Sequence, residues 1–138
     1  MKIKIEFFKD DLIEAISAGV YEISITNASG NVKTLYVGES VFVLVRCATH
    51  LFCLKSDPAY FGFTDESIND DKLTLSFKLY QAIEEKADRR KTETELIKQR
   101  HPISQSCIAD RQKGIEEKIQ ALNDFLYLDN FRVEDKSR

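Results

Sequence analysis

The sequence is poor in sulfur and has no tryptophan, with only one methionine and three cysteines in 138 residues. Cys47, Cys53 and Cys107 are odd in number and form no CxxC pair, so they fit reduced thiols in a reducing compartment better than a disulfide framework. Cys47, His50 and Cys53 could be zinc ligands, but no fourth ligand is spaced to complete a tetrahedral site. Buried cysteines are therefore the better interpretation.

A long hydrophobic run and a leader are also lacking. Met1 to Asp10 alternates lysine with isoleucine and has no apolar stretch before a small-residue cleavage site, so we expect no secretory signal. The longest apolar stretch, Val41 to Leu54, is interrupted by Arg46, Thr49 and His50 and is too short to span a bilayer. These absences predict a cytoplasmic protein with no membrane segment.

Glycine and proline are scarce, with five and two residues, which leaves little room for long disordered linkers. A hydrophobic content of 43% beside 31% charged residues is ordinary for a globular protein. The length suits one hydrophobic core. We therefore expect a single domain over residues 1–138.

A basic surplus is missing, because the net charge is −3. Proteins that bind a phosphate backbone usually carry excess positive charge, so this balance argues mildly against nucleic-acid binding. The charge is uneven, however: residues 78–113 hold nine basic and six acidic side chains. Only this stretch is locally basic.

Hydrophobic periodicity predicts the order of the elements. Period-2 patterns indicate an edge strand near Ile3–Phe7, a hairpin of strands 20–25 and 35–37 around a polar turn at 27–31, and a further strand over 73–79. Helical patterns predict four helices. The first is a short segment with Leu12, Ile13 and Ile16, the second is the apolar stretch 41–54, and the third is a charged region 83–100 that ends before Pro102. The fourth carries Ile115, Ile119, Leu122 and Leu126 at helical spacing. The fold class is therefore mixed α/β (α+β), with a small, mainly antiparallel sheet flanked by helices.

Four polar side chains are expected to gather on this scaffold. If the hairpin is centred between Ala28 and Ser29, Tyr21 lies opposite Tyr36 on the same sheet face. Arg46 and His50 are four residues apart and share one side of a helix that is otherwise so apolar that two polar neighbours are conspicuous. Two phenols, a guanidinium and an imidazole could then share one site.

These residues belong to a wider pattern. Gly19-Val20-Tyr21, Tyr36-Val37-Gly38, Arg46 and His50 resemble the signature of the GIY-YIG nuclease family in order and spacing. Downstream, Glu93 lies three residues before Leu96-Ile97, nine before Pro102 and twelve before Gln105, where the family has an asparagine. The resemblance covers Gly19 to Gln105, 87 residues, and implies a catalytic core at 19–105 with extensions at 1–18 and 106–138.

The resemblance implies a metal-dependent endonuclease that hydrolyses a phosphodiester bond in DNA. Its implied catalytic residues are Tyr21, Tyr36, Arg46, His50 and Glu93. Glu93 would bind Mg²⁺ or Mn²⁺, Arg46 would stabilise the phosphorane-like state, and His50 would assist proton transfer. Tyr21 is the first candidate for the base and Tyr36 the second, although a phenol is a poor base unless positive charge lowers its pKa.

Gly38, Ser40, Lys98 and Gln105 complete the implied site as substrate-binding positions. Two residues depart from the family: Glu39 stands where many relatives have lysine or a small polar residue, and Gln105 has a longer side chain than asparagine. These departures keep a second hypothesis open. It is a catalytically weakened domain of the same fold that binds nucleic acid or protein, as a homodimer or in a larger complex.

Each candidate also has a simpler interpretation. Tyr21 and Tyr36 could be core residues with a solvated hydroxyl, and His50 a satisfied core histidine. Arg46 could pair with an acid of the loop at 56–71, and Gly38 could serve only the turn into the helix. The nuclease interpretation requires the five catalytic residues to converge on one solvent-open cleft. The apolar C-terminal helix must also pack on the domain or form a dimer.

Overall fold

The computed structural model describes residues 1–105 and 114–128. The strands in this part of the chain are β1 (Lys4–Phe7), β2 (Gly19–Thr26), β3 (Val32–Ser40) and β4 (Thr74–Ala82). The helices are α1 (Val43–Ser56), α2 (Lys86–Arg100) and α3 (Ile115–Asn123), which continues as the π-helical turn η4 (Asp124–Leu128). Short 3₁₀ turns are η1 (Glu14–Ile16), η2 (Pro58–Phe61) and η3 (Ser67–Asn69).

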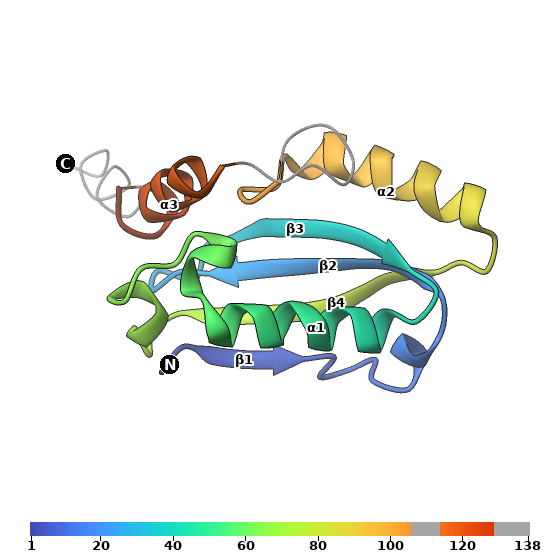
Figure 1. The fold of residues 1–138 in the computed structure, drawn as a ribbon, viewed down its shortest axis with the longest axis horizontal. Helices are drawn as coiled ribbons and strands as arrows, with labels where there is room; N and C mark the ends of the chain where they lie inside the picture. Colours follow the sequence, from blue (N-terminus) through green and yellow to red (C-terminus); the bar gives the residue numbers. More distant parts are fainter. Residues whose placement is uncertain (106–113, 129–138) are drawn as a thin grey trace.

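The strands form one sheet in the order β1-β4-β2-β3 (Figure 1). β1 pairs with β4 in parallel, whereas β4 with β2 and β2 with β3 are antiparallel. This confirms the predicted α+β class with a small, mainly antiparallel sheet. The N-terminal strand lies at an edge, as its alternating pattern predicted.

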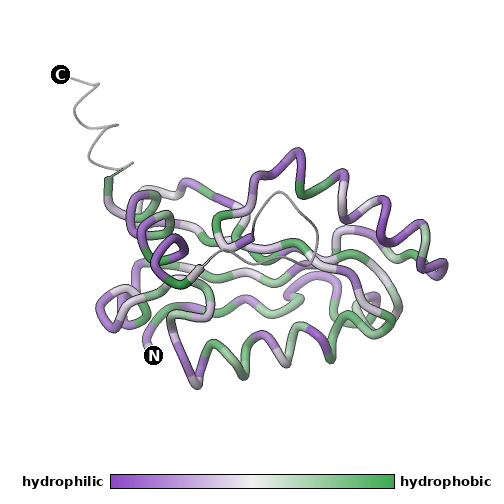
Figure 2. The backbone as a smooth tube through the Cα atoms, turned by 45° about the horizontal axis from the view of Figure 1, so that its top comes forward, coloured by the Kyte–Doolittle hydropathy of each residue, from purple (hydrophilic) through white to green (hydrophobic). Residues whose placement is uncertain are grey.

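The two faces of the sheet are covered by different helices. Successive residues of a strand point to opposite faces. The main core joins Tyr21 and Tyr36 to Val43 and Cys47 of α1, together with Ile23, Ile25, Leu35, Leu54, Leu75 and Phe77. The second face carries Val20 and Val37, which pack against Leu96 and Ile97 of α2. α1 and α2 therefore lie on opposite faces. α2 runs alongside β3 in Figure 1 and is mainly hydrophilic in Figure 2.

The hairpin register differs from the prediction by two residues. Tyr21 pairs with Gly38, and Tyr36 pairs with Ile23. A bulge after Ile23 adds a residue to one strand, and the Asn27 carboxamide accepts two backbone N–H groups of the turn, which sets the loop length. Tyr21 and Tyr36 still share a face, because Ile23 points to the same side as Tyr21.

A stretch as apolar as 41–54 predicts a helix covered on more than one side. Helix α1 is covered on one side only, so that prediction is wrong. Its buried residues Val43, Cys47, His50 and Leu54 face the sheet. Val45 and Phe52 point away and are 54% and 69% exposed. No helix in the described residues is long and apolar enough to cross a membrane.

Both predicted extensions contribute to the core. The first 18 residues provide Ile3, Phe8 and Ala15. At the other end, α3 and η4 provide Leu122 and Leu126, so the expected packing of the C-terminal helix on the domain is confirmed. Figure 1 shows α3 at the end of the sheet where α1 finishes. The alternative of a homodimer stays a prediction.

The packing of α3 is tested by Leu122→Ala, which removes a fully buried side chain. We expect the free energy of unfolding to fall by about 2–4 kcal/mol, because the change combines lost burial with a cavity. Urea denaturation measures this. Ile115→Ala on the same helix, where the side chain is 57% exposed, is the matched control and should change stability by less than about 0.5 kcal/mol. Equal effects would show that α3 does not pack as described.

Candidate active site

A buried imidazole between two phenols lies at the centre of the candidate site. His50 Nε2 is 2.7 Å from the hydroxyl oxygen of Tyr21, and His50 Nδ1 is 2.9 Å from that of Tyr60. Tyr21 comes from β2, His50 from α1 and Tyr60 from η2. Three elements therefore meet through two hydrogen bonds: strand β2, and the consecutive elements α1 and η2.

Gly38 makes room for this arrangement. A Cβ at Gly38 would lie 2.2 Å from the Tyr21 hydroxyl oxygen and 2.4 Å from its Cζ. The Tyr21 ring therefore crosses directly over Gly38, and only glycine leaves the phenol a path to α1. This close approach is the structural role of Gly38, and its predicted contact with substrate stays a prediction.

Further aromatic rings pack around the imidazole. The ring centroids of Tyr36 and His50 are 5.0 Å apart, and those of Tyr21 and Tyr36 are 6.4 Å apart. Phe61 closes the cluster, with its centroid 5.8 Å from that of His50. Tyr36 thus joins Tyr21 and His50, as the sequence predicted, although by ring contacts rather than by direct opposition in the hairpin.

Arg46 reaches the same hydroxyl from the solvent side. Its guanidinium lies close enough to the Tyr21 hydroxyl for its charge to oppose the rise in the Tyr21 pKa. None of the ion pairs among residues 1–105 and 114–128 involves Arg46, so it does not pair with an acid of the loop at 56–71. The residue is exposed. Its charge is therefore not neutralised by a carboxylate in the described part of the chain.

Burial controls the protonation of the cluster. It raises the pKa of Tyr21, an effect that the nearby Arg46 opposes without overcoming. Burial, and then the charge of Arg46, lower the pKa of His50 to about 3. At neutral pH Tyr21 is thus a protonated phenol and His50 a neutral imidazole. This direction of the pKa shift disfavours Tyr21 as the base, and that role stays a prediction.

Two orders of hydrogen bonds fit the two contacts of His50, one for each tautomer of the neutral imidazole. In the first, the Tyr21 hydroxyl donates to Nε2 and the Nδ1–H donates to the Tyr60 oxygen; in the second, both directions are reversed. A guanidinium only donates, so Arg46 beside the Tyr21 oxygen favours the first order, with the Nδ1–H tautomer.

Glu93 does not join this cluster. It lies on the buried side of α2 together with Arg89, Leu96 and Ile97, and that side packs on the second face of the sheet. Arg46 stands on the first face. The expectation that all five catalytic residues converge on one cleft is therefore wrong for Glu93. Leu96 and Ile97 of α2 pack against the sheet. Glu93 lies on the same side of the helix because it precedes these residues by three and four positions, about one helical turn.

The remaining predicted residues are dispersed. The Ser40 hydroxyl accepts from the backbone N–H of Phe42 at the entry to α1, 3.1 Å away. Lys98 is exposed on α2. Gln105 is buried, and its amide bonds both backbone groups of Val37, with distances of 2.9 Å to the N–H and 2.8 Å to the carbonyl. Gln105 therefore holds the edge of β3, and its predicted contact with substrate stays a prediction.

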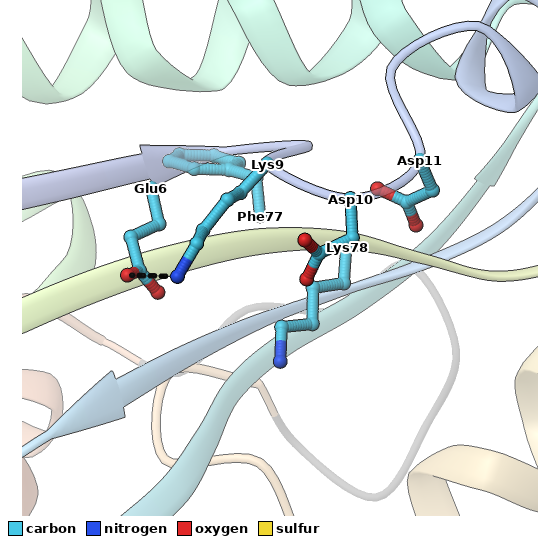
Figure 3. A pocket seen from close by; sticks show the side chains of 6 residues that line it. All are labelled: Glu6, Lys9, Asp10, Asp11, Phe77 and Lys78. Atoms are coloured by element: carbon cyan, nitrogen blue, oxygen red, sulfur yellow. Dashed lines mark ion pairs between the residues drawn. The ribbon is translucent and has the colours of Figure 1, made fainter.

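A separate pocket lies near β1 and β4 and contains none of the predicted site residues. Its lining includes Glu6, Lys9, Asp10, Asp11, Phe77 and Lys78 (Figure 3). Lys9 and Glu6 form an ion pair at 3.5 Å, and the Asp11 carboxylate accepts from the backbone N–H of Leu79 at 2.9 Å. The pocket contains no residue of the tyrosine–histidine cluster, so we do not place the candidate chemistry here.

Tyr60 and Lys118 are contributors that sequence reasoning missed. Tyr60 holds Nδ1 of His50, and the Lys118 ammonium donates to the backbone carbonyl of Tyr60 at 2.9 Å. Tyr60 lies in an irregular loop, where no spacing rule applies. Lys118 did leave a signal, because it falls between Ile115 and Leu122 on the apolar side of its helix.

Comparison with known proteins gives no match: no protein-family model, curated protein or solved structure corresponds to this chain. The resemblance to GIY-YIG nucleases therefore depends on the quoted motifs alone. The structure defines an α+β domain in which Tyr21, His50 and Tyr60 form a chain of hydrogen bonds. The exposed Arg46 lies beside the phenol of Tyr21.

The close approach of Tyr21 to Gly38 is tested by Gly38→Ala. We expect a loss of about 1–3 kcal/mol in the free energy of unfolding, because the added methyl overlaps the ring. Gly114→Ala is the control, since a Cβ there meets only a Glu117 carboxylate oxygen at 3.9 Å. Adding Tyr21→Ala to Gly38→Ala should give less than the sum of the two losses. Additive losses in urea denaturation would count against the overlap.

The low pKa of His50 predicts a pH dependence of stability. The unfolded imidazole takes up a proton near its ordinary value of 6.5, whereas the folded one does so only at about 3. Between these values the unfolded state binds the extra proton, so stability should fall as pH is lowered, by about 1.4 kcal/mol per pH unit. Urea denaturation from pH 7 to pH 4 should show a shallower slope for His50→Gln. His101→Asn should keep the wild-type slope, and a His50→Gln slope equal to it would contradict the assignment.

Proposed function

We propose that this chain is a GIY-YIG-type endonuclease domain that binds DNA and hydrolyses a phosphodiester bond, with Arg46 and Glu93 acting from the two faces of the sheet at one end of β3. This arrangement replaces the single cleft that the sequence predicted, which does not form. The observation that supports this most directly is the Tyr21 hydroxyl, which is hydrogen-bonded to His50 and lies within the electrostatic reach of the Arg46 guanidinium. An arginine fork without a carboxylate partner matches the geometry of phosphate oxygens. The buried Tyr21–His50 pair keeps that fork in place.

We place the phosphate at the end of edge strand β3 that runs from Gly38 to Ser40. Ile103 and Ser104 donate to the carbonyls of Thr34 and Leu35, and Gln105 bonds Val37, so this segment covers β3 only as far as Val37. From Gly38 to Ser40, no hydrogen bond from a described residue outside the hairpin reaches the strand backbone. Among the described residues this short stretch thus has no further backbone partner, and we place the ligand beside Glu39 and Ser40, which are half-buried.

Arg46 and Glu93 approach that end from opposite faces. On one face, the Arg46 guanidinium lies beside the phenol of Tyr21, whose ring crosses over Gly38. On the other face, Arg89 pairs with Glu39, the next residue along β3, at 3.6 Å, and Glu93 follows Arg89 by one helical turn. A phosphate placed across this end of β3 would have a guanidinium on one side and a carboxylate on the other.

A divalent cation is implied by the family resemblance, and Glu93 would hold it. Mg²⁺ is commonly bound through one or two carboxylates, with water and substrate phosphate as the other ligands. A single glutamate is therefore a chemically suitable protein ligand for this cation. Within residues 1–105 and 114–128 no group of three or more histidine, cysteine, aspartate or glutamate side chains could hold a metal. Such a cation would neutralise phosphate charge.

The protein's own groups act on the phosphate and on one another. Arg46 would bind non-bridging oxygens and stabilise the charge that grows on them in the transition state. Tyr21 would orient Arg46, because its oxygen would accept from the guanidinium while its proton would be donated to His50. Tyr36 is the second phenol of the cluster and becomes the first candidate to orient water.

One observation favours a second function, the binding module. Glu93 lies on the face opposite Arg46, and Glu39 brings a carboxylate to the end of β3 where Arg89 pairs with it. A domain that kept Arg46 and its tyrosine support without a shared catalytic centre would bind phosphate and leave it intact. Cleavage separates the two functions.

The decisive assay gives the purified protein supercoiled and branched DNA with Mg²⁺ or Mn²⁺. The nuclease proposal predicts nicking that EDTA abolishes. Glu93→Gln should remove cleavage and keep the fold, because it retains size and polarity while losing the charge that binds metal. Arg46→Ala should lower the rate by about 10²–10³-fold through lost charge stabilisation. Tyr36→Phe tests the second phenol.

Matched controls lie on the exposed side of α2. Glu95→Gln and Arg90→Ala change the same types of side chain at exposed positions and should leave cleavage unchanged. Wild-type protein that retards these DNAs on a gel without cutting them would establish the binding module. If it neither cuts nor binds them, both functions are excluded.

A further inference from the structure

The described part of the C-terminal extension places a buried ammonium group behind the candidate site. Lys118 of α3 is 5% exposed, and its Nζ donates to the backbone carbonyl of Tyr60 at 2.9 Å. The same Nζ lies 5.6 Å from the centre of the Tyr60 ring, within range of a cation–π interaction. Lys118 therefore contacts both the backbone and the ring of the residue that bonds His50.

The position of Lys118 is fixed by close packing. Gly62 has a φ of 89°, and a Cβ there would lie 2.5 Å from the backbone oxygen of Lys118. Glycine thus permits both the left-handed turn and the approach of α3. Leu122 and Leu126 anchor the helix in the main core. The ammonium has little freedom to move away from Tyr60.

A buried charge at this position needs a physical reason. An ammonium loses its hydration on burial, and an apolar side chain of similar length would fill the same space at lower cost. Burial lowers the pKa of Lys118, and the Asp57 carboxylate opposes this effect. The charge is directed at Tyr60, whose hydroxyl is 2.9 Å from Nδ1 of His50.

We propose that Lys118 is a positioning residue for the candidate site: it holds Tyr60 so that the Tyr60 hydroxyl fixes the ring orientation and tautomer of His50. Helix α3, outside the 19–105 core, thereby completes the hydrogen-bond chain that ends at Tyr21, beside Arg46. The expected effect of Lys118 on DNA cleavage rests on the proposed nuclease function. Its expected effect on the tautomer of His50 does not depend on that function.

The test reads the tautomer directly. The chain has two histidines, so His101→Asn leaves His50 as the one imidazole in a ¹⁵N NMR spectrum. In this background we expect a protonated Nδ1 and an unprotonated Nε2 at pH 7. Lys118→Met, which keeps length and loses the charge and the donor, should shift both nitrogens toward a mixture of tautomers. Tyr60→Phe, which removes one oxygen, should do the same.

Controls and a second variant keep the outcome clear. Lys55→Met changes an exposed lysine at the end of α1 and should leave the His50 signals unchanged. Should Lys118→Met fail to fold, Lys118→Gln serves in its place, because it keeps a donor for the Tyr60 carbonyl while losing the charge over the ring. A spectrum of Lys118→Gln or Lys118→Met identical to the wild type overturns the positioning role.

Cleavage provides the second readout. With an active wild type, Lys118→Met should lower kcat by about 10-fold or more with little change in KM, because His50 and Tyr21 shape the site rather than bind DNA. A change confined to KM would assign Lys118 to binding and contradict the proposal. If the wild type cuts no DNA, the proposed function fails, and the NMR result still decides the role of Lys118.

Discussion

The hydrogen bond between Tyr21 and His50 is the constraint on which the rest of this site depends. It forms only if the β2–β3 hairpin has the correct register and residue 38 is glycine. It also requires α1 to turn toward the sheet the side of the helix that carries His50. Both partners are buried polar groups, so losing either one would leave the other without its hydrogen bond in the core. Fold and site are therefore specified by the same contact.

Much of this arrangement could be predicted from the sequence, because it follows from repeating patterns. Period-2 alternation located the strands, and the four-residue spacing of Arg46 and His50 placed them with the tyrosines. The register could not be predicted, since a bulge leaves no compositional trace. The exposed side of α1 was also missed, because Val45 and Phe52 look like core residues in a linear sequence. Tyr60 and Lys118 join the site through loop and tertiary contacts that have no periodicity.

Glu93 shows a different limit of sequence reasoning. Its spacing from Leu96 and Ile97 fixes which side of α2 it occupies, but not which face of the sheet α2 covers. That choice depends on how the chain passes from β4 into the helix and on the ion pair between Arg89 and Glu39. Motif spacing describes one helix at a time, whereas a shared site requires the relative placement of two.

Gln105 has a further consequence for how the protein behaves in a crowded solution. Strand β3 ends the sheet, and an uncovered edge of this length would be a template for strands of other chains. The amide of Gln105 imitates a peptide group against Val37, and Ile103 and Ser104 extend the cover along Thr34 and Leu35. Among the described residues only Gly38 to Ser40 of β3 then have no such backbone partner, a stretch too short to recruit another strand. The longer side chain of glutamine thus shields this part of the edge from pairing with other chains.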